Sequence, residues 1–475
     1  MTKKKIAKIK AIHFTVVCSY TWSAAASDGS WWVRCLGGNE FDMKRYKASR
    51  YNIIVHDEDD IVVFNSRTCA LAKVSSLFIN LLEAPNSRVT EAHETLAFQM
   101  FESGFLVSEE ADELQVLEYE YNEARYAKNK LSLAILPSFD CNFRCFYCFE
   151  DKKACVLSDR VVDGIKKFVS ANVTDIKALC VCWFGGEPLL NPGVIWELSD
   201  FFIKIAKERG FEYESVMISN GSLIDEDVVD SLKEAQISSV QITIDGDQST
   251  HDRRRCFADG HGSYCTIMDN IRLLTEKGVK VICRVNLDKT NRDGVINLIE
   301  ELGKKSFNNF QMSFGHLQPL GNENLWFKKV GYSADEFACA VDELTRFADR
   351  CGLNTSSGYP SYPRPMKNFC GACQVNSYVI HPNGDLHKCF DCIDYKIGDI
   401  YSGVGESDVE KSNLGYWMKH NPFKDNECLS CNVLPICMGS CPYLSGMHEK
   451  KFCLAWKSNI ENVVLRRYEA SKRNK

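Results

Sequence analysis

The chain lacks any uninterrupted apolar run of about 18 or more residues, the length that a membrane-spanning helix requires. It also lacks an excess of basic residues, because 57 Lys and Arg stand against 63 Asp and Glu and leave a net charge of -6. Proteins that bind nucleic acid usually carry a strongly basic surface. We therefore expect neither a membrane span nor nucleic acid as a partner.

Regular patterning is also lacking from the first 42 residues. A basic stretch, Met1–Lys10, precedes a mildly apolar one, Ala11–Ala26, that superficially resembles a secretion signal. Polar residues such as His13 and Thr15 dilute its apolar core. We expect residues 1–42 to carry no fold, with Met43 as an alternative natural start.

Cysteine, by contrast, is abundant, with 23 in 475 residues. Cys141, Cys145 and Cys148 lie within eight residues, just after an apolar run. Iron-sulfur clusters usually take four Cys ligands, so a triplet without a local fourth leaves one iron open to a small molecule. Zinc and disulfides are the alternatives, but structural zinc favours four Cys or His ligands, and no His lies within thirty residues of the triplet. Disulfides need an oxidising compartment.

The triplet and a downstream Gly-Gly-Glu-Pro segment resemble the radical S-adenosylmethionine (SAM) superfamily. That resemblance implies that the open iron binds SAM, that Glu187 meets its amino group, and that Thr243 and Arg255 meet its ribose and carboxylate. An alternative for Arg255 and its two arginine neighbours is a solvated charged run. The residues that we expect to bind the cofactor are Tyr147, Gly185, Gly186, Glu187, Pro188, Asn220, Thr243, Arg255 and Leu317.

Strand-like and helix-like segments alternate between residues 131 and 317, which predicts βαβ units and a parallel sheet. Six repeats suit an open, partial (β/α)6 barrel, whose site gathers at the C-terminal strand ends. The expected strands are Leu131–Leu136, Leu179–Phe184, Ser215–Ser219, Ser239–Ile244, Val279–Asn286 and Phe310–Leu317. The expected helices are Asp159–Ala171, Val194–Arg209, Asp225–Glu234, Tyr264–Lys277 and Asp293–Lys305.

A second cysteine group lies near the C-terminus and is similar in spacing to the SPASM domain, which carries two auxiliary clusters. Following that resemblance, Cys370, Cys373, Cys389 and Cys441 hold one cluster, and Cys428, Cys431, Cys437 and Cys453 hold the other. Cys392 is a rival ligand beside the first set, and two zinc sites are the alternative. The expected cofactors are thus SAM and three [4Fe-4S] clusters.

The N-terminal region predicts a small winged-helix-like domain. Strands are expected at Tyr51–His56, Asp60–Phe64 and Gly104–Val107, and helices at Ser75–Leu82 and Thr90–Glu102. The second helix has no Lys or Arg, so we expect either a structural cap or a clamp for a peptide strand. The expected organisation is an extension (1–42), a peptide-recognition domain (43–125), a radical SAM core (126–325), a bridging helix and linker (326–369) and a SPASM domain (370–475).

The resemblance implies an enzyme that cleaves SAM reductively to a 5′-deoxyadenosyl radical and abstracts hydrogen from a substrate. The N-terminal extension ahead of the triplet favours a ribosomally made precursor peptide that acquires a thioether or carbon-carbon crosslink. Alternatives are an anaerobic sulfatase-maturing enzyme that generates formylglycine and, in another class, a non-catalytic metal-binding regulator. Asp391 is the candidate base, with a turn residue as the alternative. Flavodoxin or ferredoxin is the expected electron donor, and oxygen-sensitive clusters favour the cytoplasm.

Overall fold

The computed structural model describes residues 45–86, 91–150, 152, 154–317, 329–355, 363–392, 394–447 and 452–473. The chain divides into two compact units. The first comprises Met1–Val116, Cys431–Ile436 and Glu461–Lys475, and the second comprises Leu117–Ser430 and Cys437–Ile460. Residues 1–42 lie outside the described residues, so their expected lack of a fold stays a prediction, as do the bounds of the five expected segments.

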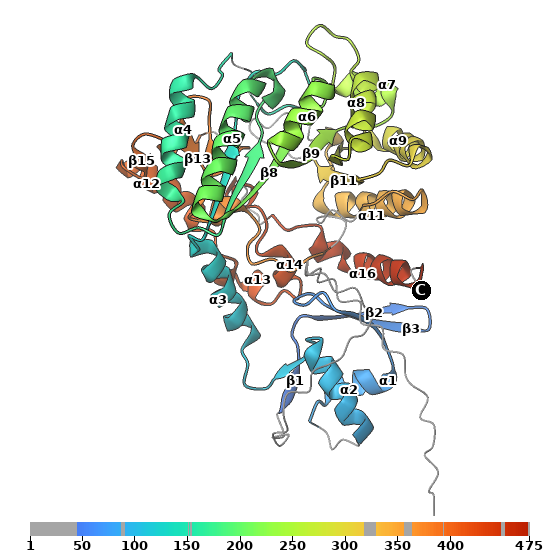
Figure 1. The fold of residues 1–475 in the computed structure, drawn as a ribbon. Coiled ribbons are helices and arrows are strands. Elements are labelled where there is room, and N and C mark those ends of the chain that lie inside the picture. The colour runs from blue at the N-terminus through green and yellow to red at the C-terminus, as the bar shows by residue number, and fades with distance from the viewer. Residues whose placement is uncertain are drawn as a thin grey trace, which may run out of the picture. The chain divides into compact units, whose positions relative to one another are not determined.

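The second unit contains a sheet with the strand order β11-β10-β9-β8-β7-β6-β12-β13-β14-β15 (Figure 1). Its first six strands are parallel, as expected, and neighbours in the chain are neighbours in the sheet. β6 pairs with β12 rather than with β11, so the barrel stays open in the described part of the chain. These strands are β6 (Lys130–Ile135), β7 (Ala178–Trp183), β8 (Glu212–Ser219), β9 (Ile237–Thr243), β10 (Lys280–Leu287) and β11 (Phe310–His316).

Helices follow the parallel strands and bury one apolar face. In α4, for example, Val161, Ile165 and Phe168 are buried in the core that the sheet shares with its helices. The five expected helices are confirmed to within a few residues. The sequence missed the short helix α7, which Asp247 caps by accepting a hydrogen bond from Thr250 N at 3.0 Å. The bounds are α4 (Asp159–Asn172), α5 (Pro192–Arg209), α6 (Glu226–Glu234), α7 (Gln248–Arg254), α8 (Tyr264–Glu276), α9 (Arg292–Lys305) and α11 (Ala334–Arg350).

Strands from the cysteine-rich region continue the same sheet, which the sequence did not predict. β12 (Ser377–Ile380) is parallel to β6, with Ile380 opposite Ile135. β13 (Asp385–His387), β14 (Gly398–Asp399) and β15 (Gly403–Val404) follow in antiparallel order. The other described helices that reach this unit are α3 (Glu113–Tyr126), η1 (Pro188–Leu190), η2 (Gly371–Cys373), α12 (Asp408–Met418), η3 (Pro422–Lys424), α13 (Asn426–Leu429), α14 (Leu434–Cys437), α15 (Pro442–Met447) and α16 (Trp456–Arg473).

The first unit is a small α+β arrangement. β2 (Asn52–Asp57), β3 (Asp60–Asn65) and β4 (Leu71–Val74) form an antiparallel sheet, and α1 (Ser76–Glu83) and α2 (Glu91–Glu102) are its helices. The strand expected at residues 104–107 is β5 (Leu106–Ser108), and it pairs with β1 (Tyr46–Ala48) in a separate sheet. The C-terminal segment joins this unit, because Tyr468 Oη donates to Asp60 Oδ2 at 2.7 Å. No described helix is long and apolar enough to cross a membrane.

Candidate functional site

The cysteine triplet lies in the loop that follows β6, at the C-terminal edge of the parallel strands. Neighbouring backbone holds this loop: Arg144 N donates to Cys256 O at 2.9 Å and Ala258 N donates to Asn142 O at 2.8 Å. The rings of Phe143 and Phe257 meet edge to face with centroids 4.9 Å apart. The loop is therefore braced against the segment that follows α7.

The three thiols differ in exposure, with Cys141 buried, Cys145 partly buried and Cys148 exposed. Burial raises the pKa of the Cys141 thiol to about 11, although the hydrogen bond from Phe143 N opposes this. A bound metal ion reverses such a preference, because it deprotonates a coordinating thiol. Within the described residues, no group of three or more His, Cys, Asp or Glu side chains is arranged to hold a single metal ion.

The two glycines after β7 pack tightly against the loop that leads into the triplet. Gly186 N donates to Ser138 O at 3.1 Å and Glu187 N donates to Asp140 O at 2.9 Å. A Cβ on Gly186 would lie 2.3 Å from Asp140 O, and one on Gly185, whose φ is +118°, would lie 2.5 Å from Ser138 O. The sequence predicts that the backbone of these glycines lies close to a ligand, and in the structure it lies close to the loop that contains Ser138 and Asp140.

Glu187 is fully buried and joins the ends of two strands. Its carboxylate accepts from Ser219 Oγ at 2.8 Å, Asn220 N at 2.7 Å and Leu189 N at 3.1 Å. Burial raises the pKa of Glu187, while these three donors lower it. It also caps the short helix η1 (Pro188–Leu190). The geometry makes Glu187 a residue that positions the loops after β7 and β8.

Asn220 extends this bracing to the triplet. Its amide donates to Asn142 Oδ1 at 2.7 Å, and Cys141 Sγ lies 3.9 Å from the same nitrogen. The structure thereby brings the predicted residues Glu187 and Asn220 together with the first cysteine of the triplet.

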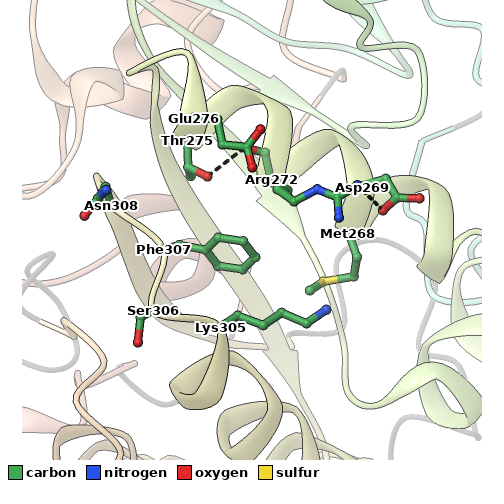
Figure 2. A pocket seen from close by; sticks show the side chains of 9 residues that line it. All are labelled: Met268, Asp269, Arg272, Thr275, Glu276, Lys305, Ser306, Phe307 and Asn308. Carbon is green, nitrogen blue, oxygen red and sulfur yellow. Dashed lines mark hydrogen bonds and ion pairs between the residues drawn. The ribbon is translucent and has the colours of Figure 1, made fainter.

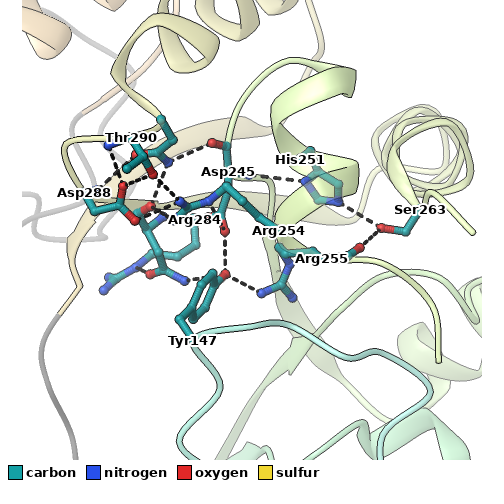
Figure 3. Close-up of polar contacts among 11 residues, drawn as sticks. Tyr147, Asp245, His251, Arg254, Arg255, Ser263, Arg284, Asp288 and Thr290 are labelled. Carbon is teal, nitrogen blue, oxygen red and sulfur yellow. Dashed lines mark hydrogen bonds and ion pairs between the residues drawn. The ribbon is translucent and has the colours of Figure 1, made fainter. Parts of the chain in front are cut away.

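Tyr147 is the centre of a buried polar network (Figure 3). Its hydroxyl donates to Asp245 Oδ2 at 2.5 Å and accepts from Arg255 Nη1 at 2.7 Å, and Asn286 Nδ2 lies 3.3 Å away. Arg255 is only 8% exposed, and its Nε is buried without a hydrogen-bond partner. The arginine run is therefore not a solvated surface at this position.

Arg254, which the sequence did not single out, is also buried. It contacts Asp245 Oδ2 at 3.4 Å and Asp288 Oδ2 at 2.8 Å, which joins the ends of β9 and β10. Its Nη1 lies 3.2 Å from Thr290 Oγ1. Only Arg253 of the three arginines is exposed. The signal in the sequence was weak, because a run of like charges usually marks a solvated surface.

His251 fixes the backbone beneath this network. Its Nδ1 accepts from Asp245 N at 3.3 Å, so the ring proton is on Nε2, which donates to Ser263 Oγ at 3.0 Å. Ser263 Oγ in turn donates to Arg255 O. Burial, followed by the charges of Arg255 and Arg254, holds the pKa of His251 well below 6.5. The neutral imidazole thus connects the two residues that flank Tyr147.

The two remaining predicted cofactor residues lie at the ends of strands β9 and β11. Thr243 is the last residue of β9, is 9% exposed, and pairs with Arg284 of β10. Leu317 follows β11 directly, and its backbone N donates to Leu287 O at 3.3 Å. Both occupy the same edge of the sheet as the triplet loop.

Four of the predicted auxiliary ligands gather in the second unit. Cys370 and Cys441 interact electrostatically, and both interact with Cys373 and with Cys389. Burial raises the pKa of Cys373 to about 12, whereas Arg125 and Lys388 lower it. Burial has the opposite effect on the nearby ammonium group, because it lowers the pKa of Lys388 to about 7, while Cys373 and Cys370 raise it.

The rival ligand, Cys392, has different neighbours. It is 2% exposed and belongs to the apolar core, where it interacts with Asp394 and Tyr443. The other four predicted ligands, Cys428, Cys431, Cys437 and Cys453, are all described, and their joint role stays a prediction.

Two carboxylates interact with each other, and Glu150 lies beside Cys148 of the triplet whereas Asp391 lies beside Cys389 of the auxiliary set. Burial raises the pKa of Asp391 to about 6 and that of Glu150 to about 7, and the charge of Asp391 contributes to the shift of Glu150. Glu150 follows the triplet by two residues and was not predicted as a site residue. Its Oε1 is buried without a hydrogen-bond partner.

A separate cavity of about 320 Å³ lies between α8 and the segment before β11 (Figure 2). Met268, Phe307 and Lys305 line it together with polar residues. Because residues 306–308 precede β11, this cavity lies at the opposite end of that strand from the triplet edge. It is not part of the candidate site.

Comparisons with known proteins agree with this geometry. Residues 135–302 match the radical SAM superfamily model. A cysteine-type anaerobic sulfatase-maturating enzyme of Clostridium novyi is 26% identical over 374 residues, which is 70% of this chain and 95% of that protein. The radical SAM cyclopropyl synthase TigE of Paramaledivibacter caminithermalis is 22% identical over 448 residues, which is 85% of this chain and 90% of TigE.

Among solved structures, native anSMEcpe with bound AdoMet and Cp18Cys peptide is 18% identical. It covers 72% of this chain and 99% of its own, with a TM-score of 0.56, and therefore shares the fold. The match places a radical SAM domain at residues 135–302, and the open parallel barrel and the loop-borne triplet agree with it. The expected superfamily, enzyme class and α/β fold are confirmed, and SAM and a [4Fe-4S] cluster are the cofactors of this class.

Proposed function

We propose that this enzyme is a peptide maturase that oxidatively installs a thioether or carbon-carbon crosslink in a ribosomally made precursor peptide. The observation that carries the proposal is the gathering of Cys370, Cys373, Cys389 and Cys441 beside the sheet that holds the triplet loop. A second cluster near the radical site suits a net oxidation, because the electron left on the substrate needs an acceptor.

The residues around the triplet suit SAM. Together with the cluster on Cys141, Cys145 and Cys148, bound SAM supplies a radical that abstracts hydrogen. Arg255 has a buried, unpartnered Nε, which is the donor that a buried carboxylate requires. Tyr147 and Asp245 hold its guanidinium in place.

The other cofactor residues have supporting roles in this proposal. Gly185, Gly186 and Glu187 hold the loops around the SAM site, with Pro188 starting the helix that Glu187 caps. Asn220, Thr243 and Leu317 line the same strand edge. Asp391 is the proposed base, because a substrate radical that loses an electron must also lose a proton.

In the proposed enzyme, eight C-terminal cysteines hold two auxiliary clusters. Cys370, Cys373, Cys389 and Cys441 hold one auxiliary [4Fe-4S] cluster, and a second set holds another, namely Cys428, Cys431, Cys437 and Cys453. The first unit offers sheet edges that suit an extended guest peptide. Flavodoxin or ferredoxin supplies electrons, and the protein works in the cytoplasm.

Sulfatase maturation is the second candidate function. It is favoured by the Clostridium novyi enzyme, because the alignment covers 95% of that protein. In this case the substrate is a Ser or Cys residue that becomes formylglycine. Both candidates use the same radical site and differ in the product.

Co-expression of the full chain with small Cys- or aromatic-containing peptides encoded nearby tests the first candidate. We expect a product lighter by two hydrogens that does not react with a hydrazide, because a crosslink contains no aldehyde. The matched control is the Cys141→Ala/Cys145→Ala/Cys148→Ala variant, which should give unmodified peptide and no 5′-deoxyadenosine. A parallel arm offers a sulfatase-derived peptide.

A hydrazide-reactive product from the sulfatase peptide, with no change in any precursor peptide, would replace the first candidate by the second. Deoxyadenosine formation without a change in any peptide of either arm would refute both. Iron analysis tests the cofactor assignment separately, since three four-iron clusters require about twelve iron atoms per chain and the triplet variant about eight.

A further inference from the structure

Arg125 is buried at the C-terminal end of α3, beside the first auxiliary cysteine set. It is 3% exposed, and its backbone carbonyl accepts from Val375 N at 2.9 Å, two residues beyond Cys373. Its guanidinium carbon lies 5.6 Å from the ring centroid of Tyr121 and 5.5 Å from that of Tyr126. Aromatic faces thus surround the charge without neutralising it.

The guanidinium of Arg125 has polar atoms that nothing in the described chain satisfies. Its Nε and Nη2 are both buried without hydrogen-bond partners. A buried charge without a partner is expensive, and native proteins rarely retain one. Arg125 interacts electrostatically with the thiol of Cys373. The unpartnered N–H groups are therefore placed for an anionic group held at Cys373.

Lys388 supplies a second buried cation at the same place. It is 4% exposed, and its Nζ lies 2.5 Å from Gln374 O, 2.8 Å from Ser377 O and 3.2 Å from Val375 O. Three carbonyl acceptors around one nitrogen require three N–H groups, which only the ammonium form provides, so these contacts oppose the lowering of the Lys388 pKa by burial. Lys388 immediately precedes Cys389 in the chain.

We propose that Arg125 and Lys388 neutralise the charge of the auxiliary cluster held by Cys370, Cys373, Cys389 and Cys441, and that Arg125 donates N–H to its sulfur atoms. This inference rests on the proposed auxiliary cluster. A four-iron cluster with four thiolates carries about two negative charges in its oxidised form, and net charge and hydrogen bonds to sulfur set its reduction potential. Two buried cations raise that potential, which makes the cluster a better electron acceptor.

The test is a potentiometric titration of the reconstituted full chain, followed by electron paramagnetic resonance. The triplet variant serves as background, so that the signals come from auxiliary clusters. We expect Arg125→Gln to shift one midpoint potential to more negative values and Arg125→Lys to shift it less, because Lys keeps the charge. The control, Arg350→Gln, removes the same formal charge from an exposed position on α11 and should shift nothing.

Stability of the iron-free chain separates this role from a merely structural one. Because no described protein group accepts from Nε or Nη2 of Arg125, Arg125→Leu should leave the melting temperature of the iron-free protein unchanged or higher, and should lower it once the clusters are reconstituted. Equal destabilisation of both forms would overturn the inference. So would an unshifted potential in Arg125→Gln with full iron content.

The underlying cluster has a test of its own. If Cys370→Ala/Cys373→Ala retains the iron content of the parent, the proposed auxiliary cluster fails. If that variant loses iron while Arg125→Gln changes no potential, the cluster stands and only the role of Arg125 is refuted.

Discussion

Removing the hydroxyl of Tyr147 should loosen the strand ends that carry the proposed SAM site. In Tyr147→Phe, Asp245 loses a donor at 2.5 Å and Arg255 loses an acceptor at 2.7 Å, both inside the protein. Hydrogen bonds to charged groups contribute about 1.5–3 kcal/mol each, and partial relaxation offsets some of the loss, so we expect a local cost of about 3 kcal/mol.

Hydrogen exchange at Asn286 measures this cost locally, because its amide donates to Asp245 Oδ1 at 3.0 Å. A chain with two compact units need not unfold in one step, so a local reading is preferable to a global midpoint. The affinity for SAM should also fall about tenfold, which corresponds to about 1.4 kcal/mol, because Arg255 is no longer held in place.

Tyr264→Phe is the matched control, since Tyr264 Oη donates to the carboxylate of Glu301 at 2.7 Å on the outer helices. Its removal should cost about 1.5 kcal/mol, the low end of the same range because the Glu301 side chain is partly exposed, and should leave both the exchange of the Asn286 backbone amide and the SAM affinity unchanged. Unchanged exchange at Asn286 in Tyr147→Phe, or equal effects of the two substitutions, would refute the reasoning.

Three further outcomes are expected. Gly186→Ala should destabilise the chain by about 2–4 kcal/mol and lower cluster incorporation, because its Cβ would lie 2.3 Å from Asp140 O. The control is Gly193→Ala in α5, whose Cβ would meet nothing within 4 Å and which should be neutral or stabilising. Thermal unfolding of both variants measures the difference. The pKa of His251 is lower in the folded chain than in the unfolded chain, so the unfolded chain binds more protons below pH 6.5. The free energy of unfolding should therefore decrease as the pH is lowered below 6.5, by up to about 1.4 kcal/mol per pH unit. His251→Gln should flatten that slope in acid unfolding curves, and an unchanged slope would argue against the buried neutral ring. Glu187→Gln places an amide among three donors and should release the loop after β8, detected as faster exchange of the Asn220 amide, with Glu197→Gln on the exposed face of α5 as the unaffected control.

Hydrophobic periodicity was sufficient to predict the barrel. Most of the parallel strands bury alternate residues, and five expected amphipathic helices lie between the six strands, so the pattern repeats with little ambiguity. The helix α7 was missed because its residues are polar and its length is seven. The buried Arg254 of α7 pairs with Asp245 and Asp288, which lie in other segments, and such pairs leave no periodic pattern of apolar residues in the sequence.

The candidate site was predictable where chemistry depends on residue type and spacing, as in the cysteine triplet. Arg254, Asp245 and Glu150 were not predictable as partners, because their roles arise from contacts between segments distant in sequence. The two glycines show the opposite case. They predict a close approach of the backbone to a ligand, whereas the structure shows a close approach to the loop before the triplet, so the contact with a ligand stays a prediction.

The pairing of β12 with β6 gives the two cysteine groups a common support. Ile135 ends β6 six residues before Cys141, and its partner Ile380 ends β12 nine residues before Cys389. Just beyond the paired ends, the rings of Phe139 and His381 meet edge to face at 5.0 Å, so the two chains stay together past the last ladder pair. Because the register between β6 and β12 fixes the points at which the chain leaves both strands, a shift of β12 would move the auxiliary cysteines relative to the triplet. In the proposed enzyme, strand pairing, a rigid element, therefore sets the separation between the two cysteine groups.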